Sequence, residues 1–163
     1  MKGRKRSVRV VFITALVVVF AGLAFEWLYV LQMNISLFTA IDKADLVGIQ
    51  KSLSLGANPN ARNHGVSALA SACFQGKYKA TDMLVKAGAN VNMVSDTGWT
   101  PLMYAVASPN EDTVYTVKAV LRYRPDVNFT NGYGVNALNI ARSRDDETTA
   151  ALLLAAGARE TRH

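Results

Sequence analysis

The stretch that decides the fold, residues 88–105, reads GANVNMVSDTGWTPLMYA. Its opening letters GANVN repeat the GANPN of residues 56–60 at a distance of 32 residues. Related segments, RPDVN and GAR, begin 36 residues later at Arg124 and a further 33 residues later at Gly157. A motif that returns at a nearly constant spacing is the sequence signature of a repeat protein.

The later letters TPLMYA form a second motif in the same register. It begins at Thr100, and the related segments SAL and NALNIA begin at Ser67 and Asn136, 33 residues before it and 36 residues after it. Two independent motifs that keep one register are hard to obtain by chance. The sequence therefore predicts a tandem array of units, each of which needs its neighbours to bury its apolar face.

Each unit is predicted to contain two short helices. Thr100 can cap the first helix, and Pro101 can occupy its first position, where a missing N–H costs nothing. A leucine and an alanine then face inward, and a second helix ends at a glycine in the position that favours positive φ. The predicted caps are Ser67, Thr100 and Asn136, the inward pairs are Leu69 with Ala72, Leu102 with Ala105 and Leu138 with Ala141, and the closing glycines are Gly56, Gly88 and Gly157.

These motifs resemble ankyrin repeats, whose unit of about 33 residues begins a helix with T-P-L-H-x-A. DTGWTPL at residues 96–102 is the closest match, and GANVN at residues 88–92 matches the loop that closes a unit. The resemblance covers residues 36–160 and implies an all-α solenoid of about four units, an ankyrin-repeat domain over residues 36–163. It departs from the pattern in the first unit, which lacks the T-P-L start, at the extra residues Ser108-Pro109-Asn110, and after Gly157.

The N-terminal segment predicts one transmembrane helix over residues 10–31. These 22 residues contain a single charge, Glu26, and as a helix they span about 33 Å, enough for a hydrocarbon core of ~30 Å. Five Lys and Arg residues precede the span, so residues 1–9 are expected to be cytoplasmic and the repeats periplasmic or otherwise extracytoplasmic. Residues 32–35 are expected to be a linker.

A cleavable signal peptide is the alternative, with secretion after cleavage near Ala24. The small residues 21–24 resemble a cleavage site, but Trp27 to Leu31 prolong the apolar run past it and favour an uncleaved signal anchor. Both alternatives export the repeats. Gly22 is the only glycine in the span, so no G-x-x-x-G face supports dimerisation of this helix.

Charge and residue usage argue against several function classes. The chain has 18 Lys and Arg and 12 Asp and Glu, but five of the basic residues precede Val10, which leaves 13 against 12. This balance argues against nucleic-acid binding. The single cysteine, Cys73, excludes an internal disulfide and is expected to be a buried packing group. Residues 145–147 are expected to complement a helix dipole and to share a solvated charged face with Arg142 and Arg144. We expect no enzyme activity, cofactor, metal or small-molecule substrate.

The ankyrin resemblance implies a protein partner, bound by the turn tips and the concave face of the first helices. Trp99 and Tyr133 are the strongest candidates, because aromatic residues dominate interface hot spots. For Trp99, packing across the turn onto the next unit remains an alternative, and Phe74 is open between core and contact. The candidate residues are Asn63, His64, Val66, Asp96, Thr97, Trp99, Tyr133 and Val135 in the turns, and Phe74, Gln75, Ser108, Ser143 and Arg144 on the helices.

The sequence thus predicts a membrane-anchored, non-catalytic protein-binding module presented outside the cytoplasm. Two narrower roles remain alternatives: an immunity-type inhibitor of a toxin, and an accessory subunit of an envelope membrane complex.

Overall fold

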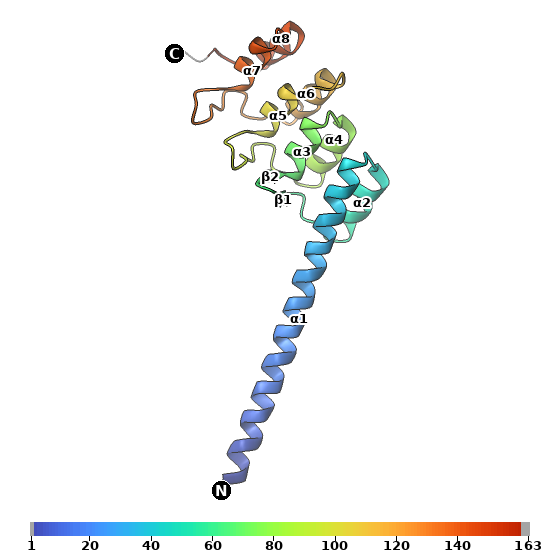
Figure 1. Ribbon diagram of the computed structural model, residues 1–163, viewed down its shortest axis with the longest axis vertical. Helices are drawn as coiled ribbons and strands as arrows, with labels where there is room; N and C mark the ends of the chain where they lie inside the picture. The colour runs from blue at the N-terminus through green and yellow to red at the C-terminus, as the bar shows by residue number, and fades with distance from the viewer. Residues whose placement is uncertain (1, 161–163) are drawn as a thin grey trace.

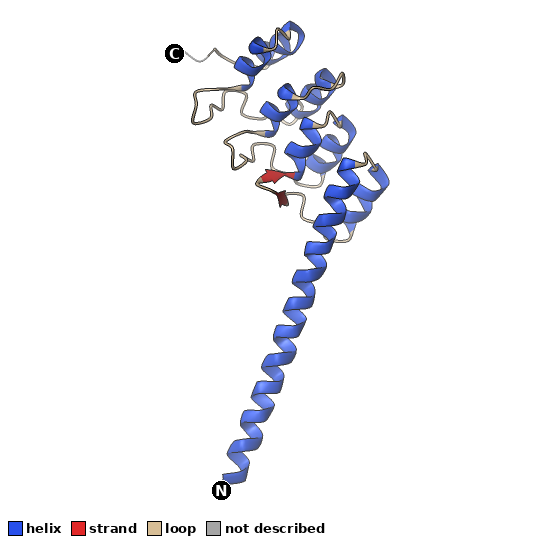
Figure 2. Cartoon of the chain, viewed as in Figure 1, coloured by secondary structure: helices blue, strands red, loops and turns tan. Residues whose placement is uncertain are grey.

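The computed structural model describes the backbone of residues 2–160 and the side chains of residues 21–160. A long N-terminal helix leads into a stack of helical hairpins (Figure 1). Helices dominate the described residues (Figure 2). Two strands of two residues each form a short antiparallel hairpin in which Arg62 lies opposite Ser67. In chain order the elements are α1 Lys2–Asp42, α2 Leu46–Ser54, β1 Arg62–Asn63, β2 Val66–Ser67, α3 Ala68–Phe74, α4 Tyr78–Lys86, α5 Pro101–Ala107, α6 Thr113–Leu121, α7 Ala137–Ser143 and α8 Glu147–Ala155.

The helices pair into the four predicted units. The end of α1 pairs with α2, α3 with α4, α5 with α6, and α7 with α8. First helices contact the first helices of neighbouring units, and second helices contact second helices. The loops before α3, α5 and α7 project from one side of the stack (Figure 1). We call residues 61–67, 94–100 and 130–136 the finger loops.

The predicted helix caps are confirmed. The Ser67 hydroxyl accepts a hydrogen bond from the Ala70 N–H at 3.1 Å, and the Thr100 hydroxyl accepts one from Met103 at 3.3 Å. Asn136 accepts one from the Asn139 N–H at 2.9 Å and forms a full capping box. These bonds satisfy N–H groups that a helix start would otherwise leave without a partner, so the three first helices begin where the sequence places them.

The predicted leucine–alanine pairs form the core. All six side chains are buried, none exposing more than 2% of its surface. Full burial of one leucine contributes roughly 1.5–3 kcal/mol, and small alanines let neighbouring helices approach closely. The same cluster continues into the first unit through Leu37, Ile41 and Ile49. The core is therefore one layer that runs through the whole stack.

Asparagines in the closing loops join one unit to the next. Asn60 Oδ1 accepts from the Asn90 N–H at 2.7 Å, while Asn60 Nδ2 donates to the Gly88 carbonyl at 3.1 Å. The same two bonds recur from Asn128 to Arg159 and Gly157, at 2.8 Å and 3.0 Å. We call this series the loop ladder. It explains in physical terms why the GANVN motif returns with the repeat spacing.

Helix α1 is continuous from the N-terminal segment into the first unit (Figure 1). The prediction of a linker at residues 32–35 is wrong, because Gln32-Met33-Asn34-Ile35 contains neither glycine nor proline and the helix passes through it. Asn34 also takes a place in the loop ladder, since its Oδ1 accepts from the Asn58 N–H at 2.8 Å. The last turns of α1 therefore serve as the first helix of unit one, and Asn34 replaces the loop of a preceding unit.

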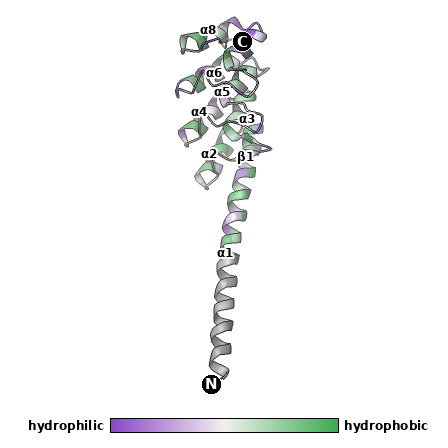
Figure 3. Cartoon of the chain, turned by 90° about the vertical axis from the view of Figure 1, so that its left-hand side faces the viewer, coloured by the Kyte–Doolittle hydropathy of each residue, from purple (hydrophilic) through white to green (hydrophobic). Residues whose placement is uncertain are grey.

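The predicted membrane span lies only partly within the described side chains. Among residues 21–160, no helix is both long and apolar enough to cross a bilayer. Residues 10–20 of the predicted span, and the basic residues before them, lie outside that range. Below the stack, the described part of α1 carries many apolar residues (Figure 3), among them Phe25 and Leu28, which are exposed.

Of the acidic run at residues 145–147, only Glu147 lies in the predicted first turn of the last helix, because Asp146 is the N-cap and Asp145 precedes it with a φ of 54°. The Asp146 carboxylate accepts from the Thr149 N–H at 2.9 Å, and Glu147 lies in the first turn of α8 and pairs with Arg142 at 2.8 Å. Arg144 does not join this charged face, because its guanidinium donates to the Ala107 and Ser108 carbonyls of the preceding unit. One predicted surface charge therefore connects two units.

Candidate partner-binding surface

An aromatic cluster lies where the finger loops meet the first helices. The Tyr104 ring on α5 is 6.2 Å from the Phe74 ring at the end of α3, nearly edge-on, and 5.5 Å from the Trp99 ring in the second finger loop. We call Phe74, Trp99 and Tyr104 the aromatic rim. Phe74 is 45% exposed, and the other two rings are half-buried. Two neighbouring units thus place three aromatic rings side by side at the surface.

Tyr104 holds this cluster in place. Its hydroxyl donates to Ser95 Oγ at 3.3 Å and lies 3.2 Å from Thr97 Oγ1, both in the second finger loop. A half-buried tyrosine with its hydroxyl bonded is rigid, which lowers the entropy cost of presenting its ring. Sequence reasoning missed Tyr104. The available signal was a comparison between repeats, because the equivalent position is Ser71 in the unit before it and Ile140 in the unit after it.

Trp99 packs mainly within its own unit. Its ring contacts Tyr104 and borders the hydrophobic core while keeping part of its surface accessible. Phe74 reaches the next unit through Tyr104 but remains largely outside the core. Both rings therefore combine a packing role with accessible surface, and their contact with a partner stays a prediction.

The first two finger loops are tied by an arginine. Arg62 Nη1 is 2.9 Å from Asp96 Oδ1, and Arg62 Nη2 donates to the Val94 carbonyl at 2.7 Å. The Asp96 N–H also donates to the Gly65 carbonyl at 3.2 Å. Asn63, His64, Asp96 and Thr97 are all exposed at these tips, whereas Val66 is half-buried. The candidate residues of the two loops therefore form one connected, largely polar edge.

The third finger loop presents Tyr133. Its side chain is 85% exposed. Asn131 Oδ1 accepts hydrogen bonds from the backbone N–H groups of Tyr133 and Val135, each at 3.0 Å. The loop is therefore fixed while the ring stands free of the core. Val135 is half-buried and packs against the core, so only part of it is accessible.

The candidates at the helix ends divide into accessible and buried residues. Gln75 donates to Asp42 at 2.8 Å and is half-buried, while Ser143 and Arg144 are exposed. Ser108 is fully buried, so its prediction as a contact residue is wrong. The reason is the extra segment 108–110, which folds back so that Asn110 Nδ2 donates to Ser108 Oγ at 3.0 Å and to the Phe74 carbonyl at 3.3 Å.

The cysteine thiol is not part of this surface. Cys73 is fully buried, and burial raises the pKa of its thiol to about 12, so it packs as a small apolar group. Among residues whose side chains are described, no group of His, Cys, Asp and Glu is placed to hold a metal ion. A polar network joins Asp82 and Lys86 of α4, 2.7 Å apart, with Tyr123, which follows α6 and whose hydroxyl donates to Asp82 at 2.6 Å.

A family model described as "Ankyrin repeats (3 copies)" matches residues 37–116 and 71–162. The chain belongs to the ankyrin repeat family. Ankyrin repeats mediate protein–protein interaction and are generally non-catalytic, and the match indicates no catalytic family. The all-helical repeat fold predicted from the two motifs is thereby confirmed.

Known proteins that are similar to this ankyrin-repeat chain include two curated proteins and one solved structure. It is 34% identical over 94 residues to putative ankyrin repeat protein YahD of Escherichia coli K12, covering 55% of this chain and 46% of YahD. It is 36% identical over 69 residues to the mouse RelA-associated inhibitor, covering 42% of this chain but 8% of that protein. An ankyrin repeat domain from Acinetobacter baumannii superposes with a TM-score of 0.70 at 29% identity, covering 76% of this chain and 64% of that one. The chain thus spans less than two thirds of the length of each.

Proposed function

We propose that this ankyrin-repeat chain is a membrane-anchored, non-catalytic module that binds a protein partner outside the cytoplasm through the aromatic rim and Tyr133. The exposure of these rings carries the proposal. Large aromatic side chains held rigidly at a surface, with a polar border, are the composition of interface hot spots. Here Phe74 and Tyr133 are accessible while hydrogen bonds fix the backbone and neighbours around them.

Continuity of α1 supports the anchor. At ~1.5 Å per residue, its 41 residues extend about 61 Å, long enough for a bilayer span and the first helix of unit one. The small residues 21–24 lie inside this helix, whereas a peptidase binds its substrate as an extended chain. Phe25 and Trp27 are 72% and 68% exposed on α1, so no side chain among residues 21–160 covers them. An uncleaved helix embedded in lipid accounts for both features.

The test compares variants of the full-length chain extracted from membranes. Phe74→Ala and Tyr133→Ala should each weaken capture of an envelope protein by about tenfold or more, as loss of a hot spot does. Tyr115→Ala is the matched control, because Tyr115 is 60% exposed on the second-helix side. A C-terminal reporter active only outside the cytoplasm tests the orientation. The proposal is overturned if Phe74→Ala and Tyr133→Ala both capture the partner as wild type does, or if the reporter lies in the cytoplasm.

A further inference from the structure

A groove runs between α4 and α6, the second helices of the two middle units. It has a volume of about 330 Å³. Tyr78 and Tyr115 line it beside the first turns of these helices, with their ring centroids 5.9 Å apart. The two residues are 36% and 60% exposed. We call this the α4–α6 groove, and it is separate from the aromatic rim, which lies on α3, α5 and the second finger loop.

Basic side chains line the same groove. Lys79, Lys118 and Arg122 are all exposed, and Lys79 Nζ lies 5.9 Å from the centroid of the Tyr78 ring. No carboxylate among residues 21–160 lies within ion-pair distance of any of these three cations. Within the described part of the chain, their charge therefore has no direct anionic partner.

One carboxylate, Asp82, also lines the groove, but both of its oxygens are engaged. Asp82 Oδ1 accepts from the Tyr123 hydroxyl at 2.6 Å, and Oδ2 lies 2.7 Å from Lys86 Nζ. Together with Lys86, four cations are gathered around this single carboxylate. The near balance of charge over residues 10–163 thus conceals a positive excess in this groove.

The repeat fold does not require these charges. The fully buried Leu84, Val120 and Leu153 take equivalent places in α4, α6 and α8, and the buried Ser52 does so in α2. The positions five and two residues before this place and two residues after it are charged or aromatic in the middle units and uncharged in the outer units. They hold Lys79, Asp82 and Lys86; Tyr115, Lys118 and Arg122; Val47, Gln50 and Ser54; and Thr148, Ala151 and Ala155.

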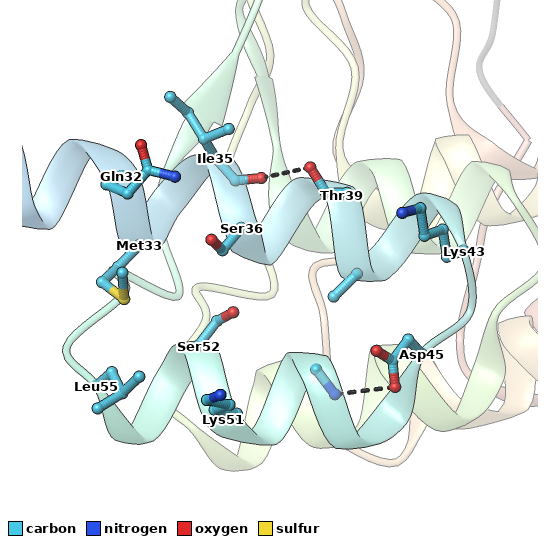
Figure 4. A pocket seen from close by; sticks show the side chains of 12 residues that line it. Gln32, Met33, Ile35, Ser36, Thr39, Lys43, Asp45, Lys51, Ser52 and Leu55 are labelled. Atoms are coloured by element: carbon cyan, nitrogen blue, oxygen red, sulfur yellow. Dashed lines mark hydrogen bonds between the residues drawn. The ribbon is translucent and has the colours of Figure 1, made fainter.

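The cavity between α1 and α2 lacks the same combination (Figure 4). It has a volume of about 480 Å³, and Lys43 and Lys51 line it, but none of the described residues in its lining is aromatic. Its carboxylate, Asp45, accepts from the Gly48 N–H at 2.9 Å and caps α2. Lys43 and Lys51 are exposed as the groove cations are, so they provide a comparison at equal charge.

We infer that the α4–α6 groove binds a short acidic segment of a protein, with its carboxylates at the lysines and Arg122 and an apolar side chain on the two tyrosine rings. Tyrosine rings present flat apolar surface to such a side chain, and exposed cations are complementary to carboxylates spaced along a chain. From Tyr115 to Arg122 the groove runs about 10 Å at ~1.5 Å per residue. That length corresponds to about three residues of an extended chain at ~3.3 Å each.

Other anionic surfaces fit this groove less well. Duplex DNA is held by cations spread over many phosphates, whereas here the cations lie along one short groove that begins at two rings. A bilayer surface attracts basic clusters next to the membrane anchor. Figure 1 shows α4 and α6 farther from the N-terminus of α1 than α2 is. The groove therefore goes beyond the proposed function as a second binding site.

The experiment uses the full-length chain in a non-ionic detergent and a fluorescently labelled peptide with one phenylalanine followed by three glutamates. A peptide with three glutamines in their place is the control for charge. Fluorescence anisotropy should give a Kd at least about tenfold lower for the glutamate peptide, and added salt should raise this Kd because exposed charges are screened.

Variants then place the peptide in the groove. The double variant Lys118→Gln with Arg122→Gln should weaken binding of the glutamate peptide about fivefold or more, and Tyr115→Ala about threefold or more. Lys43→Gln with Lys51→Gln is the matched control, because it removes the same charge outside the groove and should leave the Kd unchanged. Because the groove is separate from the aromatic rim, Tyr115→Ala should still leave capture through the rim unchanged.

The remaining outcomes overturn this inference and leave the proposed function intact. They are equal affinity for the two peptides, an equal Kd for the groove double variant and its matched control, and loss of the peptide in Phe74→Ala but not in Tyr115→Ala. Displacement of the peptide by a short-chain phosphatidylglycerol or a DNA duplex at lower concentration than by unlabelled glutamate peptide would assign the groove to lipid or nucleic acid instead.

Discussion

The repeat stack and the stretch of α1 below it treat apolar residues in opposite ways. In the stack, Leu102 and Leu138 are enclosed by the helices of adjacent units. On α1, Leu28 and Phe25 are exposed, although their side chains are equally apolar. The stack therefore supplies its own stability, whereas these apolar residues of α1 lie outside any core formed by the described residues. The difference teaches that hydrophobicity alone does not distinguish a core position from an external contact.

The largest expected effect comes from exchanging leucine for alanine in the two regions. Leu102→Ala leaves a cavity between α5 and its neighbours and should lower the free energy of unfolding by about 2–5 kcal/mol. Leu28→Ala, at a 57% exposed position, should leave the unfolding of the repeats unchanged. Urea titrations of the two full-length variants in detergent provide the measurement. Equal losses would mean that α1 is packed against the stack.

An intermediate effect is expected in the loop ladder. Asn60→Ala removes the bonds to the Asn90 N–H and the Gly88 carbonyl and should destabilise the stack by about 1–3 kcal/mol. Asn63→Ala, at an exposed position three residues after Asn60, is the control and should have little effect. Thermal melts of the two variants give the comparison. If Asn60→Ala leaves the melting temperature unchanged, side-chain packing alone holds the units in order.

The smallest expected effect concerns pH and the second helices. Hydrogen bonds from Lys86 and Tyr123 hold the pKa of Asp82 below its usual range. A carboxyl whose pKa falls on folding stabilises the protein above the unfolded pKa, and this contribution is lost as the pH falls through the folded pKa. Asp82→Asn should thus melt below wild type at neutral pH and approach it as the pH falls below about 4. Glu111→Gln, at an exposed position, is the control, and a gap that persists in acid would contradict the assignment.

Features that depend on a few neighbouring residues were predictable from the sequence. Ser67, Thr100 and Asn136 cap helices, and Gly56, Gly88 and Gly157 adopt positive φ, because these roles need only local geometry. The buried leucine–alanine pairs followed from the repeat register. Each of these features recurs in several units, so one motif supports the interpretation of the others.

Features that depend on distant contacts were not predictable in the same way. Ser108 is buried because an inserted segment folds back onto α3, and no periodicity encodes that path. Tyr104 became part of the candidate surface only when the second finger loop was placed over its hydroxyl. The linker prediction at residues 32–35 failed because the change in composition there is not accompanied by a change in backbone. The position of the first finger loop relative to the second likewise depends on the ion pair between Arg62 and Asp96, which are far apart in the sequence.

The unbroken α1 helix fixes the direction in which the repeats face. Each residue of an α-helix advances the chain by ~1.5 Å and turns it by about 100°. The number of residues between the N-terminal segment and the first unit therefore sets the rotation of the finger loops about the axis of α1. One alanine inserted at residues 32–35 would swing the whole stack by more than a quarter of a circle while leaving its composition and charge almost untouched. The direction of the stack relative to the N-terminal segment therefore depends on helical phase through residues 32–35.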